Sequence, residues 1–276
     1  MKKILVPTDF SDQAENALKV AAKLAKRFNS EVHLLHVLEL PLELIDPVQG
    51  HSSRNLPESI FFMKLAHQRF SKLLKAPYLK NITTQEHVQF NDAYKGILEF
   101  CEKDQFDLIV MGSYGASGFQ EMFIGSNTEK IVRHSTTPVL VIKRSAEEFN
   151  IKEFVFATDA EPVNKHTLQK ASEFATLLGA NLHLLYVNTP NNFRTSKEVQ
   201  DQIKAFTEGQ NDIVVKSHIY NDITVEKGIM NFAAEINADL MGISTHGRKG
   251  IAHFFNGSIS EDLVNNANRP VITFRI

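Results

Sequence analysis

The sequence predicts two α/β domains of one design, each a parallel sheet with helices on both faces. Three observations predict this fold. Strand-like apolar runs alternate with helix-like segments, the alternation occurs twice, and each half carries the same glycine-rich element. Nearly continuous apolar runs are typical of strands buried on both faces of a parallel sheet. A chain of 276 residues is long enough for two domains that each bury a core.

The two halves align at an offset that changes once. Asp9 matches Asp159, and 34–37 matches 184–187, at an offset of 150; from Gly96 and its partner Gly228 onward the offset is 132. The first half therefore carries 18 more residues, and the stretch 41–57, rich in Pro, Ser and Asn, is typical of the loop that would hold them. We expect one domain at residues 1–145 and a second at residues 150–276.

Each half alternates five strands with four helices. Strands are expected in the first half at residues 3–7, 32–37, 82–90, 108–111 and 139–143. Its helices are expected at residues 14–28, 59–75, 93–103 and 126–134. In the second half the strands are expected at 153–157, 181–187, 213–219, 239–243 and 271–275. The helices of that half are expected at 163–178, 196–208, 223–236 and 258–267.

The repeated glycine element indicates an anion site. In the first copy Gly112 and Gly115 are followed, after nine residues, by Gly125 and Ser126. Glycines between a strand and a helix let the backbone approach a ligand and leave N–H groups free for an anion, such as a nucleotide phosphate. Asp9, Val37 and Gly112 end strands one, two and four, so a parallel sheet brings them to one crevice.

These motifs resemble those of the universal stress protein family in its tandem two-domain form. The matching segments are 4–9, 35–37, 107–112, the glycine pattern, and 138–142. The resemblance covers nearly the whole chain. It implies Rossmann-like five-stranded sheets of order 3-2-1-4-5, pairing of the domains through their last strands, and an adenine nucleotide, ATP or AMP with or without Mg²⁺, as ligand.

The resemblance also implies which residues would hold the nucleotide. In the first half Asp9 and the backbone of Val37 would meet the ribose and adenine, and the glycines and Ser126 would hold the phosphates. The full set in this half is Pro7, Thr8, Asp9, Val37, Met111, Gly112, Gly115, Gly125, Ser126 and Asn127. The counterparts in the second half are Asp159, Val187, Gly247, Gly257 and Ser258. Ser244 replaces the first glycine of that pattern, and its Cβ would stand where the backbone approaches a phosphate.

Other interpretations of these residues stay open. The glycines could serve only as turns, and the two aspartates could cap the helices that follow them. His33 and His183 recur in the second strands, where a hydrogen-bonded structural histidine is expected. Cys101 is expected to be a buried small residue.

Composition and motifs exclude several function classes. The net charge of −2 gives no electrostatic basis for general nucleic-acid binding. A single cysteine excludes a disulfide framework. No apolar stretch approaches the roughly 20 residues needed to span a bilayer. We therefore expect the chain in the cytoplasm. The sequence has neither a P-loop segment nor a G-x-S-x-G elbow. We therefore expect a nucleotide-dependent stress-response regulator; the alternatives are a ligand-free interaction scaffold and a slow ATPase.

One expectation concerns assembly. The final strands of the halves, 139–142 and 271–274, are apolar and lie at sheet edges. Uncovered edges invite pairing, and two edges in one chain can satisfy each other. We therefore expect the domains to form an internal pseudo-dimer, with a homodimer as a further association.

Overall fold

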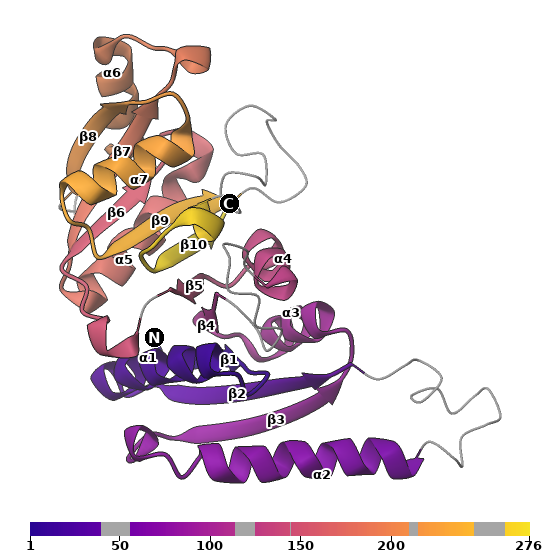
Figure 1. Cartoon of the computed structure of the whole chain (residues 1–276). Helices are drawn as coiled ribbons and strands as arrows, with labels where there is room; N and C mark the ends of the chain where they lie inside the picture. Colours follow the sequence, from indigo (N-terminus) through magenta and orange to yellow (C-terminus); the bar gives the residue numbers. More distant parts are fainter. Residues whose placement is uncertain (40–55, 114–124, 144, 210–214, 246–262) are drawn as a thin grey trace. The chain divides into compact units, whose positions relative to one another are not determined.

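The computed structural model describes residues 1–39, 56–113, 125–143, 145–209, 215–245 and 263–276 (Figure 1). The chain divides into two compact units. The first contains the described residues up to 113 together with residues 125–131, and the second contains the described residues from 132 onward.

The first unit is built from four parallel strands and their helices. In chain order its elements are β1 (Lys3–Pro7), α1 (Asp12–Phe28), β2 (Glu31–Leu38), α2 (Leu56–Leu73), η3 (Pro77–Leu79), β3 (Thr84–Phe90), α3 (Ala93–Asp104), β4 (Leu108–Gly112) and the start of α4 (Ser126–His134). β1 lies between β2 and β4, and β2 pairs with β3. In Figure 1, α2 runs along β3 at the outer edge of this sheet.

The second unit repeats this plan and adds a strand. Its elements are β5 (Val139–Ile142), η4 (Ala146–Glu148), β6 (Glu153–Ala157), η5 (Pro162–Asn164), α5 (Lys165–Leu178), β7 (Asn181–Asn188), η6 (Pro190–Asn192), α6 (Ser196–Thr207), β8 (Val215–Asn221), α7 (Val225–Glu235), β9 (Leu240–Thr245) and β10 (Val271–Arg275). Numbered within its own repeat, each set of five strands has the order 3-2-1-4-5, which confirms the predicted fold class.

The final strands of the two repeats pair with each other, as predicted. β10 runs antiparallel to β5, with Ile272 opposite Leu140. Both residues are fully buried. The backbone groups that each strand would expose at an edge are therefore satisfied by the other strand.

Element boundaries differ from the predicted ones by a few residues. One difference is at the start of α5, where the predicted helix 163–178 opens with the separate 3₁₀ turn η5. Pro162 stands first in that turn and lacks the N–H that a preceding helical turn would need. The predicted loop at 41–57 and the first part of the predicted helix 258–267 lie mostly outside the described residues; 263–266 is helical.

A repeated aspartate secures the start of the central strand in each unit. Asp107 accepts the backbone N–H groups of Lys2 and Lys3 through Oδ2, at 2.5 and 2.9 Å. Asp239 accepts those of Lys152 and Glu153 in the same way, at 2.8 and 3.0 Å. Hydrogen bonds to an ionised acceptor are stronger than neutral ones, so each carboxylate joins strands that are distant in sequence.

Two histidine pairs cross from the second strand to the edge strand of each sheet. His33 Nδ1 lies 3.1 Å from His87 Nε2, and His183 Nδ1 lies 3.0 Å from His218 Nε2. The other ring nitrogen of His33 meets Glu31, and that of His183 meets Glu153. This confirms that His33 and His183 are hydrogen-bonded structural histidines. Cys101 is buried with a free thiol, also as predicted.

None of the helices in the described ranges is both long and apolar enough to cross a bilayer.

Candidate functional site

The site of the first repeat begins with the turn that follows β1. Phe10 has a left-handed backbone with φ of 63°, which places the next residues back toward the sheet. The turn is held by side chains: Thr8 Oγ1 accepts the N–H of Phe10, and Asp9 Oδ1 accepts the N–H of Ser11, both at 3.0 Å. Ser11, not Asp9, is the N-cap of α1, since its side chain accepts the N–H of Ala14. The capping explanation for Asp9 is therefore wrong.

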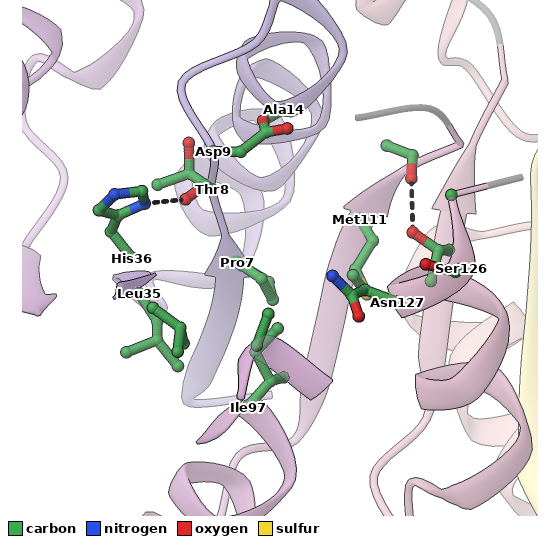
Figure 2. A pocket seen from close by; sticks show the side chains of 15 residues that line it. Pro7, Thr8, Asp9, Ala14, Leu35, His36, Ile97, Met111, Ser126 and Asn127 are labelled. Carbon is green, nitrogen blue, oxygen red and sulfur yellow. Dashed lines mark hydrogen bonds between the residues drawn. The ribbon is translucent and has the colours of Figure 1, made fainter. Parts of the chain in front are cut away.

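A cavity of about 280 Å³ opens at the carboxyl ends of β1, β2 and β4 (Figure 2). Parallel sheets place ligand sites at this end of their strands. The residues that line the cavity come from the strand ends, from the first turns of α1 and α3, and from the start of α4. They are Pro7, Thr8, Asp9, Ala14, Leu35, His36, Val37, Ala93, Ile97, Met111, Gly112, Gly125, Ser126, Asn127 and Thr128.

The cavity is lined by a hydrogen-bond acceptor on one side and by hydrogen-bond donors on the other. Asp9 supplies a carboxylate from the β1 end, and α4 starts at Ser126 and Asn127 on the other side (Figure 2). The first N–H groups of a helix have no partner within the helix and, with the helix dipole, favour an anion. Pro7, Leu35 and Ile97 also line the cavity and give part of its surface an apolar character. The cavity therefore combines an acceptor for hydroxyl groups, an apolar surface and an anion site.

The start of α4 is tied to the end of β4. The N–H of Gly125 donates to the carbonyl of Ser113 at 3.0 Å, and Thr128 Oγ1 donates to the carbonyl of Gly112 at 3.3 Å. These bonds fix the start of α4 against the end of the strand. The helix N-terminus is consequently held at the cavity by the strand that also lines it.

Gly112 is required by packing inside the protein. A Cβ at this position would lie 2.7 Å from the carbonyl oxygen of Gln13, which is closer than real Cβ contacts allow. The first turn of α1 can therefore approach β4 only because residue 112 has no side chain. Gly112 thus has a packing role that the sequence did not indicate, and it also lines the cavity.

His36 is a cavity residue that the site prediction did not include. Its Nδ1 lies 2.7 Å from the carbonyl oxygen of Thr8, so Nδ1 carries the proton and Nε2 is the acceptor in the neutral ring. Burial lowers the pKa of His36, and the nearby charge of Arg69 lowers it further, against the Thr8 hydrogen bond and Asp9. The ring is therefore neutral at pH 7 and contacts Phe10 at 4.7 Å between centroids.

The second repeat keeps the turn but adds a side-chain hydrogen bond to its aspartate. Ala160 has φ of 55°, and Thr158 and Asp159 accept the same two N–H groups as their counterparts, at 3.0 and 3.1 Å. Here, however, Asn164 Nδ2 donates to Asp159 Oδ1 at 2.6 Å. Asp159 is only 7% exposed, and Gln202 Nε2 also donates to its carbonyl, at 2.8 Å.

The structure thus brings most of the predicted first-half residues together at one cavity. The two halves differ in the hydrogen bonding of their strand-end aspartates. Nine of the predicted residues line one cavity: Pro7, Thr8, Asp9, Val37, Met111, Gly112, Gly125, Ser126 and Asn127. Asp159 and Val187 are buried in the second repeat. Gly115, Gly247, Gly257 and Ser258 lie outside the described residues.

Sequence reasoning missed six of the cavity residues, namely Ala14, Leu35, His36, Ala93, Ile97 and Thr128. His36 and Leu35 stand in the segment 35–37 that carried the resemblance, so their position at a strand end was a usable signal. Ala14 had a different signal. At the offset of 150 it pairs with Asn164, a change from a small apolar to a polar side chain.

Among the described residues, no group of three His, Cys, Asp or Glu side chains is arranged to hold a metal ion.

Comparison with known proteins assigns the family. The model of the universal stress protein family matches residues 1–143 and 150–275. Universal stress protein Slr1230 of Synechocystis is 27% identical over 300 aligned residues, covering 100% of both chains. MJ0577 of Methanocaldococcus jannaschii is 30% identical over 154 residues, covering 52% of this chain and 95% of that protein. A universal stress protein structure from Archaeoglobus fulgidus has a TM-score of 0.70 at 22% identity, covers 99% of this chain and 98% of its own, and shows the same fold. The chain thus belongs to the universal stress protein family, with one family domain in each repeat.

Proposed function

We propose that the cavity of the first repeat binds an adenine nucleotide, ATP or AMP, and that the chain is a cytoplasmic stress-response regulator controlled by this ligand. One observation carries the proposal: a carboxylate, an apolar wall and a helix N-terminus line a single cavity. A nucleotide has three matching parts, since its ribose donates hydroxyl hydrogens, its base is flat and largely apolar on its faces, and its phosphates are anionic.

Each part of the cavity has a role in this proposal. Asp9 accepts hydrogen bonds from the ribose hydroxyls. The apolar residues Pro7, Leu35 and Ile97 contact the base, and the N–H groups at Ser126 and Asn127 meet the phosphates. A universal stress protein has been solved in complex with cAMP. That complex is a property of that protein, and the proposal for this chain rests on its own cavity.

Regulation by this ligand requires two states with different affinities for it. A ligand shifts an equilibrium only by the difference in its affinity for the two states. The start of α4 is the element that we expect to respond, because it lines the cavity and is tied to β4 through Gly125 and Thr128. Filling the cavity would therefore change the position or the stability of this helix.

Calorimetric titration tests the proposal. The protein is titrated with ATP and with AMP, each with and without Mg²⁺, and the Asp9→Ala and Asp159→Ala variants serve as a matched pair. We expect one site per chain, lost in Asp9→Ala and kept in Asp159→Ala. Gly115→Val, which adds a branched side chain to the glycine pattern, is expected to lose binding while keeping the fold.

Three results would oppose the proposal in different ways. No binding of either nucleotide favours the ligand-free scaffold. Equal nucleotide affinity in Asp9→Ala and in the parent would mean that the nucleotide does not bind in this cavity. Release of phosphate from ATP at a rate that Asp9→Ala abolishes favours the slow ATPase over a regulator that only binds.

A further inference from the structure

The second repeat contains the same strand-end turn as the first, and in it an asparagine side chain donates a hydrogen bond to the aspartate. In both repeats a threonine and an aspartate side chain accept the N–H groups of the next residues at 3.0 to 3.1 Å. The residue five positions after the aspartate differs. It is Ala14 at the cavity of the first repeat and Asn164 in the second.

Asn164 is placed to act as a built-in substitute for a ligand. Its side chain is completely buried and its Nδ2 lies 2.6 Å from Asp159 Oδ1. A hydrogen bond to an ionised acceptor is among the stronger ones in proteins, and it is made here without the entropy cost of bringing in a separate molecule. A ribose hydroxyl would have to displace this amide.

The position of Asn164 is fixed by its own backbone. Its N–H donates to the carbonyl of Glu161 at 2.9 Å, and its carbonyl accepts from Thr167 Oγ1 at 2.7 Å. The 3₁₀ turn η5 ends at this residue, whereas the first repeat is already α-helical there. The amide is therefore held in the crevice as part of the fold.

A second substitution fits this arrangement. Gly112 of the first repeat, which must lack a side chain to pass Gln13, is replaced by Ser244, whose side chain is fully buried. The chain after β6 forms the 3₁₀ turn η5 where the first repeat has the first turn of α1, and the neighbouring strand β9 carries a side chain at this position. The serine and the asparagine thus accompany the same change of turn.

We propose that the side chain at this position, Ala14 or Asn164, determines which repeat can bind a nucleotide, and that Asn164 keeps the second crevice closed. The inference rests on the proposed function, because it concerns the ligand of the same kind of site. It deepens that function by naming the residue that makes the tandem protein bind one nucleotide instead of two.

Exchange of the two residues tests the inference. ATP is titrated calorimetrically into the parent, Ala14→Asn, Asn164→Ala and the double exchange, and Asp9→Ala and Asp159→Ala in each background assign the sites. Ala14→Asn should weaken binding in the first repeat at least about ten-fold. Asn164→Ala should raise the stoichiometry from one to two, and the double exchange should give one site that Asp159→Ala removes.

Asp12→Asn is the matched control, because it places an asparagine in the same helical turn at an exposed position outside the cavity. It should bind like the parent. Thermal melts followed by circular dichroism verify the fold of each variant. If Ala14→Asn does not fold, Asn164→Ala decides alone, since it tests the second repeat independently.

The outcomes separate the two proposals. A parent that binds no nucleotide refutes the proposed function. A parent that binds one nucleotide, with Ala14→Asn unchanged or with Asn164→Ala still at one site, overturns the role of this position and leaves the proposed function intact. A parent that binds two nucleotides overturns the closed second crevice in the same way.

Discussion

The two repeats of this chain share a backbone fold and differ in the side chains around the strand-end aspartate. Both have a left-handed residue after the strand-end aspartate, at Phe10 and Ala160, and both tie the central strand with an aspartate from the segment before the fourth strand. In the first repeat the aspartate borders a cavity, and in the second an asparagine side chain bonds to it. The repeated turn therefore shows that the two repeats share an architecture. Ligand binding in each repeat depends instead on the side chain next to the aspartate.

The largest effect is expected from exchanging the residues at the end of the fourth strand. Gly112→Ser would place a Cβ 2.7 Å from a backbone oxygen of Gln13, and the first turn of α1 would have to move. We expect a loss of about 1–3 kcal/mol in the free energy of unfolding. Ser244→Gly, its counterpart, should cost less than about 1 kcal/mol, because the serine hydroxyl has no hydrogen-bond partner in the described structure. Urea denaturation followed by circular dichroism measures both. Equal losses would show that the tight contact with Gln13 does not explain the glycine.

A somewhat smaller effect is expected from the aspartate that secures the central strand. Asp107→Ala leaves two backbone N–H groups at the start of β1 without their carboxylate acceptor. The expected loss is about 1–2 kcal/mol, and Asp239→Ala should lose a similar amount. Hydrogen exchange at Lys3 in the first variant and at Glu153 in the second localises the effect. A clear difference in stability loss between the two variants would show that the two aspartates are not equivalent.

The smallest effect is expected from pH. Burial lowers the pKa of His87, and the neighbouring His33 lowers it further, whereas Asp104 and Glu86 raise it. For His218, burial, His183 and Lys216 all lower the pKa. The unfolded chain therefore binds protons more readily than the folded chain just below pH 6.5, the ordinary value for these groups. Stability should be complete above this pH and decrease as the pH falls toward the lowered values.

Melting temperatures measured between about pH 7 and pH 5 check this expectation. His87→Gln and His218→Gln should each reduce the dependence on pH, because glutamine keeps a polar side chain but does not titrate in this range. Glu31 and Glu153, which bond to the other histidine of each pair, remain in both variants. A pH dependence that neither variant changes would assign it to other groups.

The sequence predicted the architecture well, because continuous apolar strands and an internal repeat are local signals. It also identified the strand-end residues of the first repeat, since a parallel sheet brings the ends of its strands to one edge. It did not predict the hydrogen bond between Asn164 and Asp159 in the second repeat. Asn164 is an ordinary residue for a helix start, and its bond to Asp159 depends on a 3₁₀ turn that the helical pattern does not indicate.

The role of Gly112 was also beyond the sequence. A glycine between a strand and a helix is compatible with a phosphate site and with close packing, and the packing requirement depends on the position of Gln13, which the sequence pattern does not indicate. The repeated aspartates Asp107 and Asp239 were visible as a matched pair, but their acceptor role required the geometry of the strand that they hold.

The central position of β1 has a consequence for how the protein is made. β1 is synthesised before its neighbour β4, which comes, with the carboxylate of Asp107, about a hundred residues later. At translation speeds of about 5–20 residues per second, one side of β1 waits on the order of five to twenty seconds for its partner. During that interval the nascent chain exposes an apolar strand edge of the kind that chaperones bind and that favours aggregation.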